Sequence, residues 1–211
     1  GKTGLDSYEG KNLIGSFYHP RRVIIDIRLL SSLPDNEINS GLFEAIKYAV
    51  LYSEELFSFI ENNLNKIRDP GIIYQLIYEC CLIKSQIVEK DQKDSDERKK
   101  LNFGHTIGHA IESLYKLRHG ESVGYGMLSA IFISKQLGTL SDHSYSKILS
   151  LINRLSLPPI HANPNLIINQ LSKDKKIKND LVNFILLNGI GNSYISNKVD
   201  ENIIRSSILN L

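Results

Sequence analysis

The feature that most limits the fold of this chain is a helical spacing of apolar residues that begins near residue 39. In NSGLFEAIKYAVLYSEELFSFIENN, residues 39–63, apolar side chains recur at intervals close to 3.6 residues. This spacing predicts amphipathic helix. Asp69 and Pro70 then supply an N-cap and a first-turn proline for another helix that runs to about residue 88. The chain is therefore predicted to be mainly α-helical.

Helical patterns continue toward the C-terminus after a charged, irregular segment at 89–97. Helices are predicted over about 99–117, 121–137 and 143–155, one more is opened by Pro164, and a last one covers about 200–210. The stretch DLVNFILL, residues 180–187, is rich in β-forming residues but alternates poorly. It predicts a strand, or a hairpin with Tyr194 and Ile195.

The first part of the chain has a different character. Residues 1–20 are glycine-rich and polar, which predicts loop or a short ribbon, and RRVIIDI at 21–27 predicts a short buried strand. The stretch SSLPDNE that follows has the chemistry of a turn leading into a helix. Because the chain starts with GKTG and not with methionine, we expect it to be a piece of a longer protein.

Composition excludes several classes of partner. The net charge of +2, from 25 basic and 23 acidic residues, predicts no nucleic-acid binding. No apolar run of about 18 residues is present, so no membrane association is predicted. Cys80 and Cys81 are neighbours and have no other cysteine to pair with, which predicts buried thiols in a reducing compartment, the cytoplasm.

A polar stripe interrupts the apolar pattern near residue 100. Arg98, Asn102, His105 and His109 are separated by 4, 3 and 4 residues, so they share one face if a helix begins by residue 98. Glycines four apart within this stretch would let another backbone or a ligand approach closely. The alternative is that the histidines lie on a solvated edge with their hydrogen bonds satisfied.

Imidazole groups at this spacing raise the possibility of a metal site. His105 and His109, at i and i+4, could chelate one ion, and His119 at the start of the next helix could reach it too. Glu44 is a candidate further ligand because it lies in an otherwise apolar helical run. The alternative for Glu44 is a surface ion pair with Lys47, three residues away.

Lysines provide candidate anion-binding groups. Lys84 lies on the apolar stripe of the helix that Pro70 opens, where it either extends to solvent or acts as an anion clamp in a pocket. Lys2, Lys11 and Asn12 lie in glycine-rich loops that suit phosphate binding. The GKT triplet is weak support for a nucleotide-binding P-loop, and the loop character after it counts against one.

Taken in order, several motifs resemble one known family. GKTG and GKNLIGSFYHPR, LPDNE followed by GLFEAIKY, an arginine followed by NFGHTIGHAIE, then HGESVGYGM and DKK resemble the 3-dehydroquinate synthases over residues 1 to about 191. The resemblance implies a two-domain protein with an α/β half that binds NAD, a helical half that holds a metal, and an active site between them. Residues 1–33 would end the first half and residues 34–211 would form the second. The expected fold is therefore a mainly α C-terminal domain preceded by a short remnant of strand and loop.

The resemblance also implies roles for individual residues. It changes the expected ligand set to Glu44, His105 and His119, with His109 on the substrate side. Groups that contact substrate phosphate, hydroxyl or carboxylate would be Lys47, Lys84, Arg98, Asn102 and one of Lys175 and Lys176. Groups near NAD would be Lys2, Lys11, Asn12, Leu29, Leu30, Ser31 and Ser32. The chain departs from the family at Asp91-Gln92, where Asp-Glu is usual, and at Asp96-Glu97, where Gly-Leu or Gly-Ile is usual.

The implied reaction belongs to the shikimate pathway of aromatic amino acid biosynthesis. It converts 3-deoxy-D-arabino-heptulosonate 7-phosphate to 3-dehydroquinate and phosphate by transient oxidation with NAD, phosphate elimination, re-reduction and aldol closure. The implied cofactors are NAD and a divalent metal, zinc or alternatively cobalt, and the full-length protein is expected to be a homodimer. The chain alone is expected to be inactive. Rival interpretations are another sugar-phosphate cyclase, a zinc-dependent polyol dehydrogenase of the same architecture, and a non-enzymatic helical scaffold.

Overall fold

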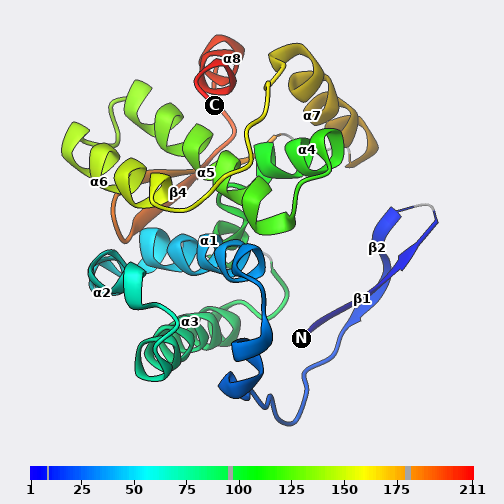
Figure 1. Ribbon diagram of the computed structural model, residues 1–211. Coiled ribbons are helices and arrows are strands. Elements are labelled where there is room, and N and C mark those ends of the chain that lie inside the picture. Colours follow the sequence, from blue (N-terminus) through cyan, green and yellow to red (C-terminus); the bar gives the residue numbers. More distant parts are fainter. Residues whose placement is uncertain (9, 95–96, 179–181) are drawn as a thin grey trace.

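The structure is a computed structural model in which residues 1–8, 10–94, 97–178 and 182–211 are described, without the side chains of 6, 7, 10–13 and 173–178 (Figure 1). It is mainly helical, as predicted. The strands are β1 (Lys2–Ser7), β2 (Gly10–Phe17), β3 (Phe184–Gly189) and β4 (Asn192–Ser196). The short 3-10 helices are η1 (Ile27–Ser32), η2 (Leu64–Lys66) and η3 (Glu97–Asn102). The α-helices are α1 (Asp35–Tyr52), α2 (Glu54–Asn63), α3 (Pro70–Lys90), α4 (His105–Tyr115), α5 (His119–Gln136), α6 (Asp142–Asn153), α7 (Pro164–Lys178) and α8 (Glu201–Leu209).

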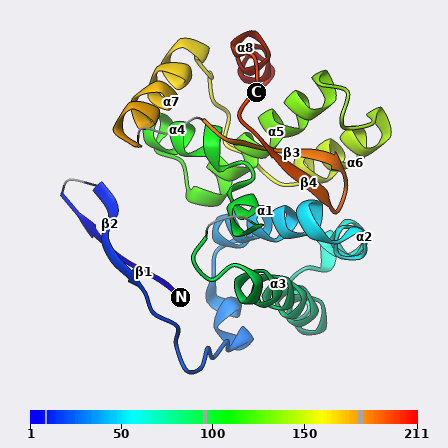
Figure 2. The same ribbon diagram turned by 180° about the vertical axis from the view of Figure 1, so that it is seen from behind.

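Helix α5 is the centre of the helical body. It packs against α1, α4, α6, α8 and β3 (Figures 1 and 2). Its buried side chains contribute to two apolar clusters, with Met127 and Ile131 in one and Tyr125 and Ile133 in the other. The first cluster joins α5 to α1, α2, α3 and α6, and the second joins it to α4, α7 and α8. A helix that is buried on all sides in this way belongs to the core.

Strand β3 lies between the same two clusters. Ile185 and Leu187 belong to the first, and Phe184 and Leu186 belong to the second. Because successive side chains of a strand point to opposite faces, a strand buried on both faces reads as a continuous apolar run. This explains why FILL alternates poorly. The prediction of a hairpin is confirmed, since β3 and β4 pair antiparallel.

Two predicted helices have different boundaries in the structure. The helix predicted from residue 39 begins earlier, at Asp35, and is interrupted at Ser53, whose side chain caps α2 by accepting a hydrogen bond from the backbone N–H of Leu56. The helix predicted over about 99–117 is wrong in its first part, because α4 begins only at His105. Gly104 precedes it with φ of +77°, a left-handed conformation that glycine adopts readily. Arg98 and Asn102 therefore lie in η3 and not on the helix that carries the histidines.

Gly104 and Gly108 were expected to allow the close approach of either another backbone or a ligand. In the structure it is a backbone that approaches them. A Cβ at Gly108 would lie 2.8 Å from the carbonyl oxygen of Ser122, and one at Gly104 would lie 2.8 Å from that of Val123. Both oxygens belong to α5. With α4 and α5 this close, the ring centroids of His105 and His119, the first residues of the two helices, lie 5.2 Å apart.

The N-terminal region differs from its prediction in one respect. Residues 1–17 form the expected ribbon, an antiparallel pair of β1 and β2. The buried strand predicted at 21–27 is wrong, since these residues form no strand and Val23 and Ile24 are 71% and 82% exposed. A β-branched run becomes a buried strand only where a neighbouring strand and a covering layer are present, and the described residues provide neither here.

Two further predictions can be compared with the structure. Cys80 is partly buried, but Cys81 is exposed, so the expectation of two buried thiols is wrong for Cys81. Among the described residues, no helix is long and apolar enough to cross a membrane.

Candidate metal centre

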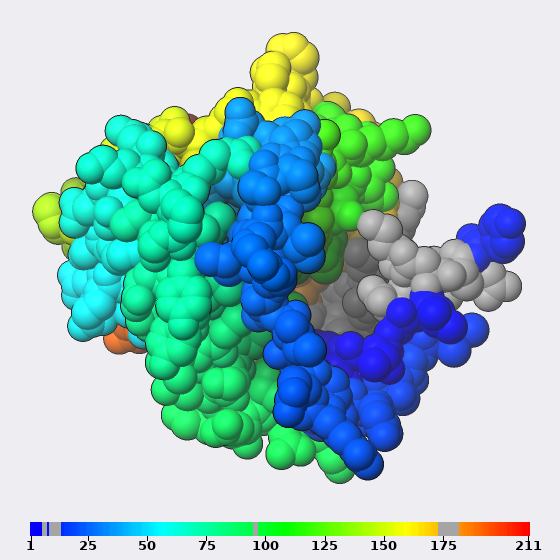
Figure 3. Space-filling model, turned by 60° about the horizontal axis from the view of Figure 1, so that its bottom comes forward, coloured from blue at the N-terminus to red at the C-terminus, as the bar shows by residue number. Residues whose placement is uncertain are grey.

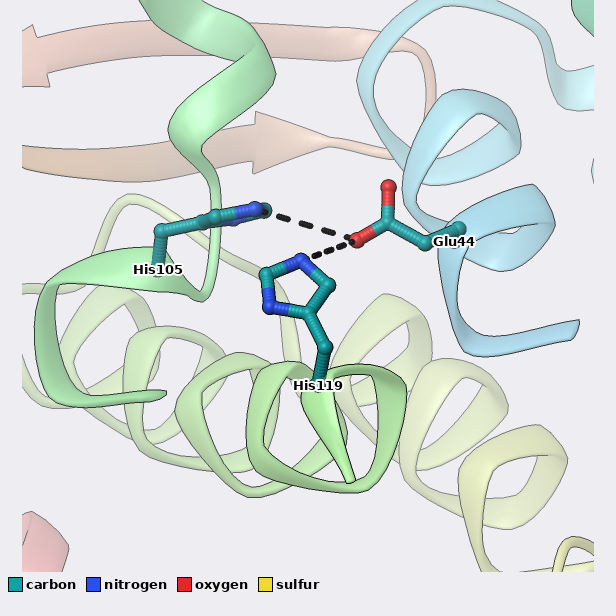
Figure 4. A group of neighbouring side chains, drawn as sticks. All are labelled: Glu44, His105 and His119. Carbon is teal, nitrogen blue, oxygen red and sulfur yellow. Dashed lines mark ion pairs between the residues drawn. The ribbon is translucent and has the colours of Figure 1, made fainter. Parts of the chain in front are cut away.

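Glu44, His105 and His119 come together from three helices. Glu44 projects from α1, and the two histidines are the first residues of α4 and α5 (Figure 4). The Nε2 atoms of His119 and His105 lie 3.5 and 3.8 Å from the same carboxylate oxygen, Oε1 of Glu44. One donor atom from each residue lies within 4.8 Å of the others. Residues 75 positions apart in the sequence thus converge on one point.

This arrangement fits a divalent metal ion. With zinc–ligand distances of about 2.0–2.2 Å, two donors on a tetrahedral ion lie about 3.3–3.6 Å apart. The distances around Glu44 Oε1 are at or slightly above this range. The same oxygen is buried and accepts no hydrogen bond from the described residues. A buried carboxylate oxygen normally has a partner, and a bound cation would supply one here.

His105 is held in a state suited to metal binding. Its Nδ1 lies 3.0 Å from the carbonyl oxygen of Phe103, which leaves Nε2 directed at Glu44. Burial and the charge of Lys47 lower the pKa of His105 to about 4. The imidazole is therefore neutral at physiological pH, and neutral imidazole is the form that binds zinc.

His119 is positioned by a close contact between α1 and α5. The backbone N–H of Gly120 donates to Oγ of Ser40 at 3.1 Å, and a Cβ at Gly120 would collide with the carbonyl oxygen of Ser40. Ser40 lies one turn before Glu44 on α1. Because glycine allows this approach, the start of α5 lies close enough to α1 for His119 to face Glu44.

Lys47 is the other partner of Glu44. Its Nζ lies 2.6 Å from Oε2 of Glu44, and the side chain is only 5% exposed. The alternative of a surface ion pair is therefore wrong. Burial lowers the pKa of Lys47, and so does the charge of Lys84. For Glu44, burial favours the protonated form, but His119, Lys47 and His105 together lower its pKa to about 2, so it is ionised.

His109 lies beside this group and forms part of another. Its ring centroid is 5.2 Å from that of His105 and 6.1 Å from that of His119. Donor atoms of His109, Glu112 and His119 also lie within 4.8 Å of one another. The structure thus places all three predicted histidines in one cluster, with His119 shared between the two groups. Which histidines bind a metal remains a prediction.

The predicted anion-binding residues differ in how far they are buried. Arg98 in η3 is buried, with its backbone N–H bonded to Asp91 and its guanidinium bonded to the carbonyl oxygen of Gln92. Asn102 ends η3 and is exposed, and Lys84 is exposed on α3. Lys84 nevertheless lies close enough to influence the pKa of Lys47. The side chains of Lys175 and Lys176 lie outside the described residues.

The residues predicted to lie near NAD belong to the N-terminal region, which precedes α1. Leu30 and Ser31 in η1 line a pocket of about 480 Å³ with the start of α3, while Leu29 is exposed and Ser32 donates to the carbonyl oxygen of Leu29. Lys2 forms an ion pair with Asp94. The side chains of Lys11 and Asn12 lie outside the described residues. No described contact joins this pocket to the metal centre.

Sequence patterns missed three supporting residues. Glu112 accepts from or pairs with Nδ1 of His119 at 3.0 Å, Ser40 anchors the start of α5, and Asp91 holds the backbone of Arg98. Glu112 had a detectable signal, since it lies three and seven residues after His109 and His105 on the same helical face. Ser40 and Asp91 act through contacts that only the fold creates.

Comparison with known proteins identifies relatives for nearly the whole chain. A family model described as 3-dehydroquinate synthase C-terminal matches residues 41–177, and one described as 3-dehydroquinate synthase N-terminal matches residues 1–40. A 3-dehydroquinate synthase of Clostridium perfringens is 42% identical over 206 residues, which is 95% of this chain and 59% of the relative. The chain spans 55% to 61% of the length of three such curated relatives.

Solved structures share the fold. A 2-deoxy-scyllo-inosose synthase complexed with carbaglucose-6-phosphate, NAD+ and Co2+ has a TM-score of 0.86 and 29% identity, covering 99% of this chain and 62% of the other. A 2-epi-5-epi-valiolone synthase from Streptomyces hygroscopicus, with NAD+ and Zn2+ bound, has a TM-score of 0.89 and 24% identity, covering 99% and 60%. At that identity the second likeness concerns the fold alone.

Proposed function

The chain belongs to the 3-dehydroquinate synthase family, and from that premise we propose that it is the metal- and substrate-binding part of an enzyme of this kind. The proposed reaction converts 3-deoxy-D-arabino-heptulosonate 7-phosphate to 3-dehydroquinate and phosphate. The observation that carries the proposal is the buried oxygen of Glu44 facing two imidazole Nε2 atoms. The assignment of residues 1–33 and 34–211 to separate domains is part of the same proposal.

Glu44, His105 and His119 are the proposed ligands of a zinc ion. One carboxylate and two neutral imidazoles leave the ion with a net positive charge and with positions open to substrate oxygens. When bound, the ion supplies Lewis acidity that lowers the pKa of a substrate hydroxyl. Support comes from the neutral state of His105 and the ionised state of Glu44. A related synthase is known with Co2+ bound, so cobalt is an alternative.

Basic side chains near this centre are the proposed binding groups for a phosphorylated sugar acid. Lys47 is buried, and the nearby charge of Lys84 disfavours its protonated form. Positive groups gathered in this way repel one another unless an anion lies between them. Arg98 adds a guanidinium that can bind phosphate or carboxylate in a bidentate manner. Asn102 and one of Lys175 and Lys176 complete the proposed substrate contacts.

His109 is the proposed proton-transfer group. It is exposed, and its ring centroid lies 5.2 Å from that of His105. An imidazole there can hydrogen-bond a substrate or phosphate oxygen and transfer a proton. The phosphate of the substrate itself is the proposed base for its elimination, which accounts for the absence of a dedicated carboxylate base in the motifs.

NAD is the proposed redox cofactor, which would accept hydride from the substrate and return it. Its proposed contacts are Lys2, Lys11, Asn12 and the segment from Leu29 to Ser32. Support comes from the related synthase that binds NAD+ and from the pocket lined by Leu30 and Ser31. Since the chain spans 55% to 61% of the length of three curated relatives, we propose that the 211-residue chain by itself does not turn over substrate.

A second candidate function is cyclisation of a different sugar phosphate. The fold likeness to 2-deoxy-scyllo-inosose synthase favours it. The relatives named 3-dehydroquinate synthase are 35% to 42% identical, however, against 29% for that synthase. A panel of phosphorylated sugars offered to the same protein would separate the two. A polyol dehydrogenase has no substrate phosphate to bind, so it would not need Lys84 or Arg98. Dehydrogenase activity that survives Lys84→Ala and Arg98→Ala would favour that function.

The activity can be tested in a chimera. The part of the Clostridium perfringens relative that precedes its match to this chain would be fused ahead of Gly1. The chimera is expected to release phosphate from 3-deoxy-D-arabino-heptulosonate 7-phosphate, and the release should require both NAD and the metal. Lys84→Ala, on the exposed face of α3, should lower kcat/KM by about tenfold or more, because it removes a charge-assisted contact.

Controls separate a folding failure from a functional one. Circular dichroism and zinc binding would show whether the chimera is folded with its metal centre intact. Exchange of Lys198, an exposed lysine after β4, for alanine should leave the rate unchanged. A folded, zinc-loaded chimera without phosphate release would contradict the proposed function.

A further inference from the structure

The ring of His119 lies between two carboxylates from different helices. Its Nε2 is 3.5 Å from Oε1 of Glu44 on α1, and its Nδ1 is 3.0 Å from Oε2 of Glu112 on α4. Lys116, with φ of +54°, turns the chain between α4 and α5, so that Glu112 and His119 face each other across the connection. The side chain of Glu112 is only 18% exposed, compared with 49% for His119.

These distances determine how the ring can be used. Nδ1 of His119 lies at hydrogen-bond distance from Oε2 of Glu112. Because an ionised carboxylate can only accept a hydrogen bond, Nδ1 must carry the proton when Glu112 is ionised. The Nε2 lone pair is then directed toward Glu44. A ring rotated or flipped about its χ2 bond would place a carbon where one of the two carboxylates now has a nitrogen partner. One contact with Glu112 therefore sets both the tautomer and the orientation of the ring.

We propose that Glu112 is a positioning residue that orients His119 and keeps its Nε2 available for the metal ion. The inference rests on the metal centre assigned under the proposed function. In metal sites, a histidine ligand commonly donates its second ring N–H to a carboxylate, which fixes the ring and raises its basicity. Glu112 does not ligate the ion itself in this arrangement; it acts through His119.

The position of Glu112 in its helix agrees with a specific role. It lies in the last turn of α4, where the partial negative charge of the helix end disfavours a carboxylate. A favourable contact with His119 offsets this cost. His105, by contrast, has its Nδ1 beside a main-chain carbonyl, that of Phe103. Of the two imidazoles, His119 is thus the one whose orientation depends on a side chain and can be altered by substitution.

The test compares three substitutions at one position. Glu112→Gln keeps an oxygen that can reach Nδ1 but removes the charge, Glu112→Asp keeps the charge but is shorter by one methylene, and Glu112→Ala removes both. Zinc Kd would be measured by competition with a chromophoric chelator. We expect Kd to rise about 10- to 100-fold for Glu112→Ala, by no more than about threefold for Glu112→Gln, and by an intermediate factor for Glu112→Asp.

A second measurement reports on ligand geometry without any enzymatic assay. Cobalt bound in place of zinc has a visible absorption spectrum that depends on its ligands. Glu112→Ala should shift or broaden this spectrum, whereas Glu112→Gln should preserve it. A residue that supported only the folding of α4 would not show rescue by glutamine. If circular dichroism shows that Glu112→Ala is unfolded, the zinc Kd values of Glu112→Gln and Glu112→Asp still test the proposal. The rise should be smaller for Glu112→Gln than for Glu112→Asp, and the reverse order would contradict it.

A matched control removes a different negative charge near the start of α5, the helix that begins with His119. Glu37 binds Arg118, the residue before His119, but does not touch the imidazole. Glu37→Gln should change the zinc Kd by less than about threefold. A similar loss in Glu37→Gln and Glu112→Ala would overturn the proposal, because general electrostatics would then explain both.

Two further results would overturn the inference while leaving the proposed function intact. One is a Glu112→Ala variant with the zinc Kd and cobalt spectrum of the unchanged chain. The other is binding of two zinc ions by the unchanged chain and one by Glu112→Ala, which would make His109, Glu112 and His119 a second site. If the unchanged chain binds no zinc, or if His105→Ala binds it equally well, the proposed metal centre itself fails.

Discussion

Residues 1–33 and residues 34–211 both contain runs of apolar residues, but the two regions differ in how far these side chains are buried. In the first region, Val23 and Ile24 are 71% and 82% exposed, and β1 and β2 stand apart from the helices (Figure 1). In the second, Phe43, Phe57 and Phe103 have no exposed surface. Figure 3 shows blue residues of the N-terminal region on the surface, beside the green residues that follow in the sequence colouring.

The difference shows that an apolar pattern needs a partner surface before it contributes stability. Each amphipathic helix of the body finds neighbours within the chain, since α1 and α5 contact each other and most of the remaining helices. The β-branched run at 21–27 finds no strand among the described residues. The two regions are joined by an ion pair between Lys2 and Asp94 and by packing of η1 against α3. The candidate metal ligands Glu44, His105 and His119 all lie in the helical body.

The largest expected effect concerns the metal. His105→Ala should abolish stoichiometric zinc binding while keeping the helical signal, because it removes one of three ligands. The control is His143→Ala, which changes an exposed histidine on α6. Deletion of residues 1–25 should leave the zinc Kd within about threefold, as the body supplies the whole centre. Zinc would be counted by elemental analysis and titration, and a large loss of affinity in the deletion would break the contrast between the regions.

The next effect is on stability. Phe57→Ala removes a fully buried ring from the first cluster and should lower the free energy of unfolding by about 3–5 kcal/mol. Ile24→Ala changes a side chain that is 82% exposed and should alter it by less than about 0.5 kcal/mol. Urea denaturation followed by circular dichroism measures both. A cost above about 2 kcal/mol for Ile24→Ala would mean that residues 21–26 are buried in solution.

The smallest effect concerns the link between the regions. Lys2→Met removes an ion pair in which the lysine side chain is 52% exposed, and such pairs contribute about 0–1 kcal/mol. The free energy of unfolding should therefore change by no more than this. Hydrogen exchange at the amides of β1 and β2 should become faster, with no change in α5. Faster exchange in α5 would show that the hairpin stabilises the core, contrary to the comparison.

Sequence reasoning anticipated the elements better than their junctions. Apart from the start of α4, the helices from Pro70 onward and the β3–β4 hairpin appear where predicted, because they contribute side chains to the buried clusters of this chain. The break before His105 was missed because the apolar spacing continues across Phe103 and Gly104, while the left-handed conformation of Gly104 depends on packing against α5. The break at Ser53 was missed in the same way, although serine is a good N-cap.

The candidate site shows the same division. Helical spacing favoured His105 and His109 as a chelating pair, since local geometry is all that spacing contains. The resemblance to the family kept His105, set His109 aside and selected Glu44 and His119, which were already candidates. The structure brings donor atoms of Glu44, His105 and His119 within 4.8 Å of one another. Glu112 shares the helical face of His105 and His109, which the pattern shows. Ser40 and Asp91 could not be chosen from the pattern, because their contacts cross from one element to another.

The amino-acid sequence by itself determined the helical class, the family and the chemical types of the site residues, because these follow from composition and from short motifs. Only the tertiary structure decided that α1, α4 and α5 meet at Glu44, and that the N-terminal apolar run stays exposed. The physical reason is that helix formation depends on neighbours along the chain, whereas a ligand set depends on how closely helices can approach. Here that approach is set by the absence of a side chain at Gly120, where α5 touches Ser40.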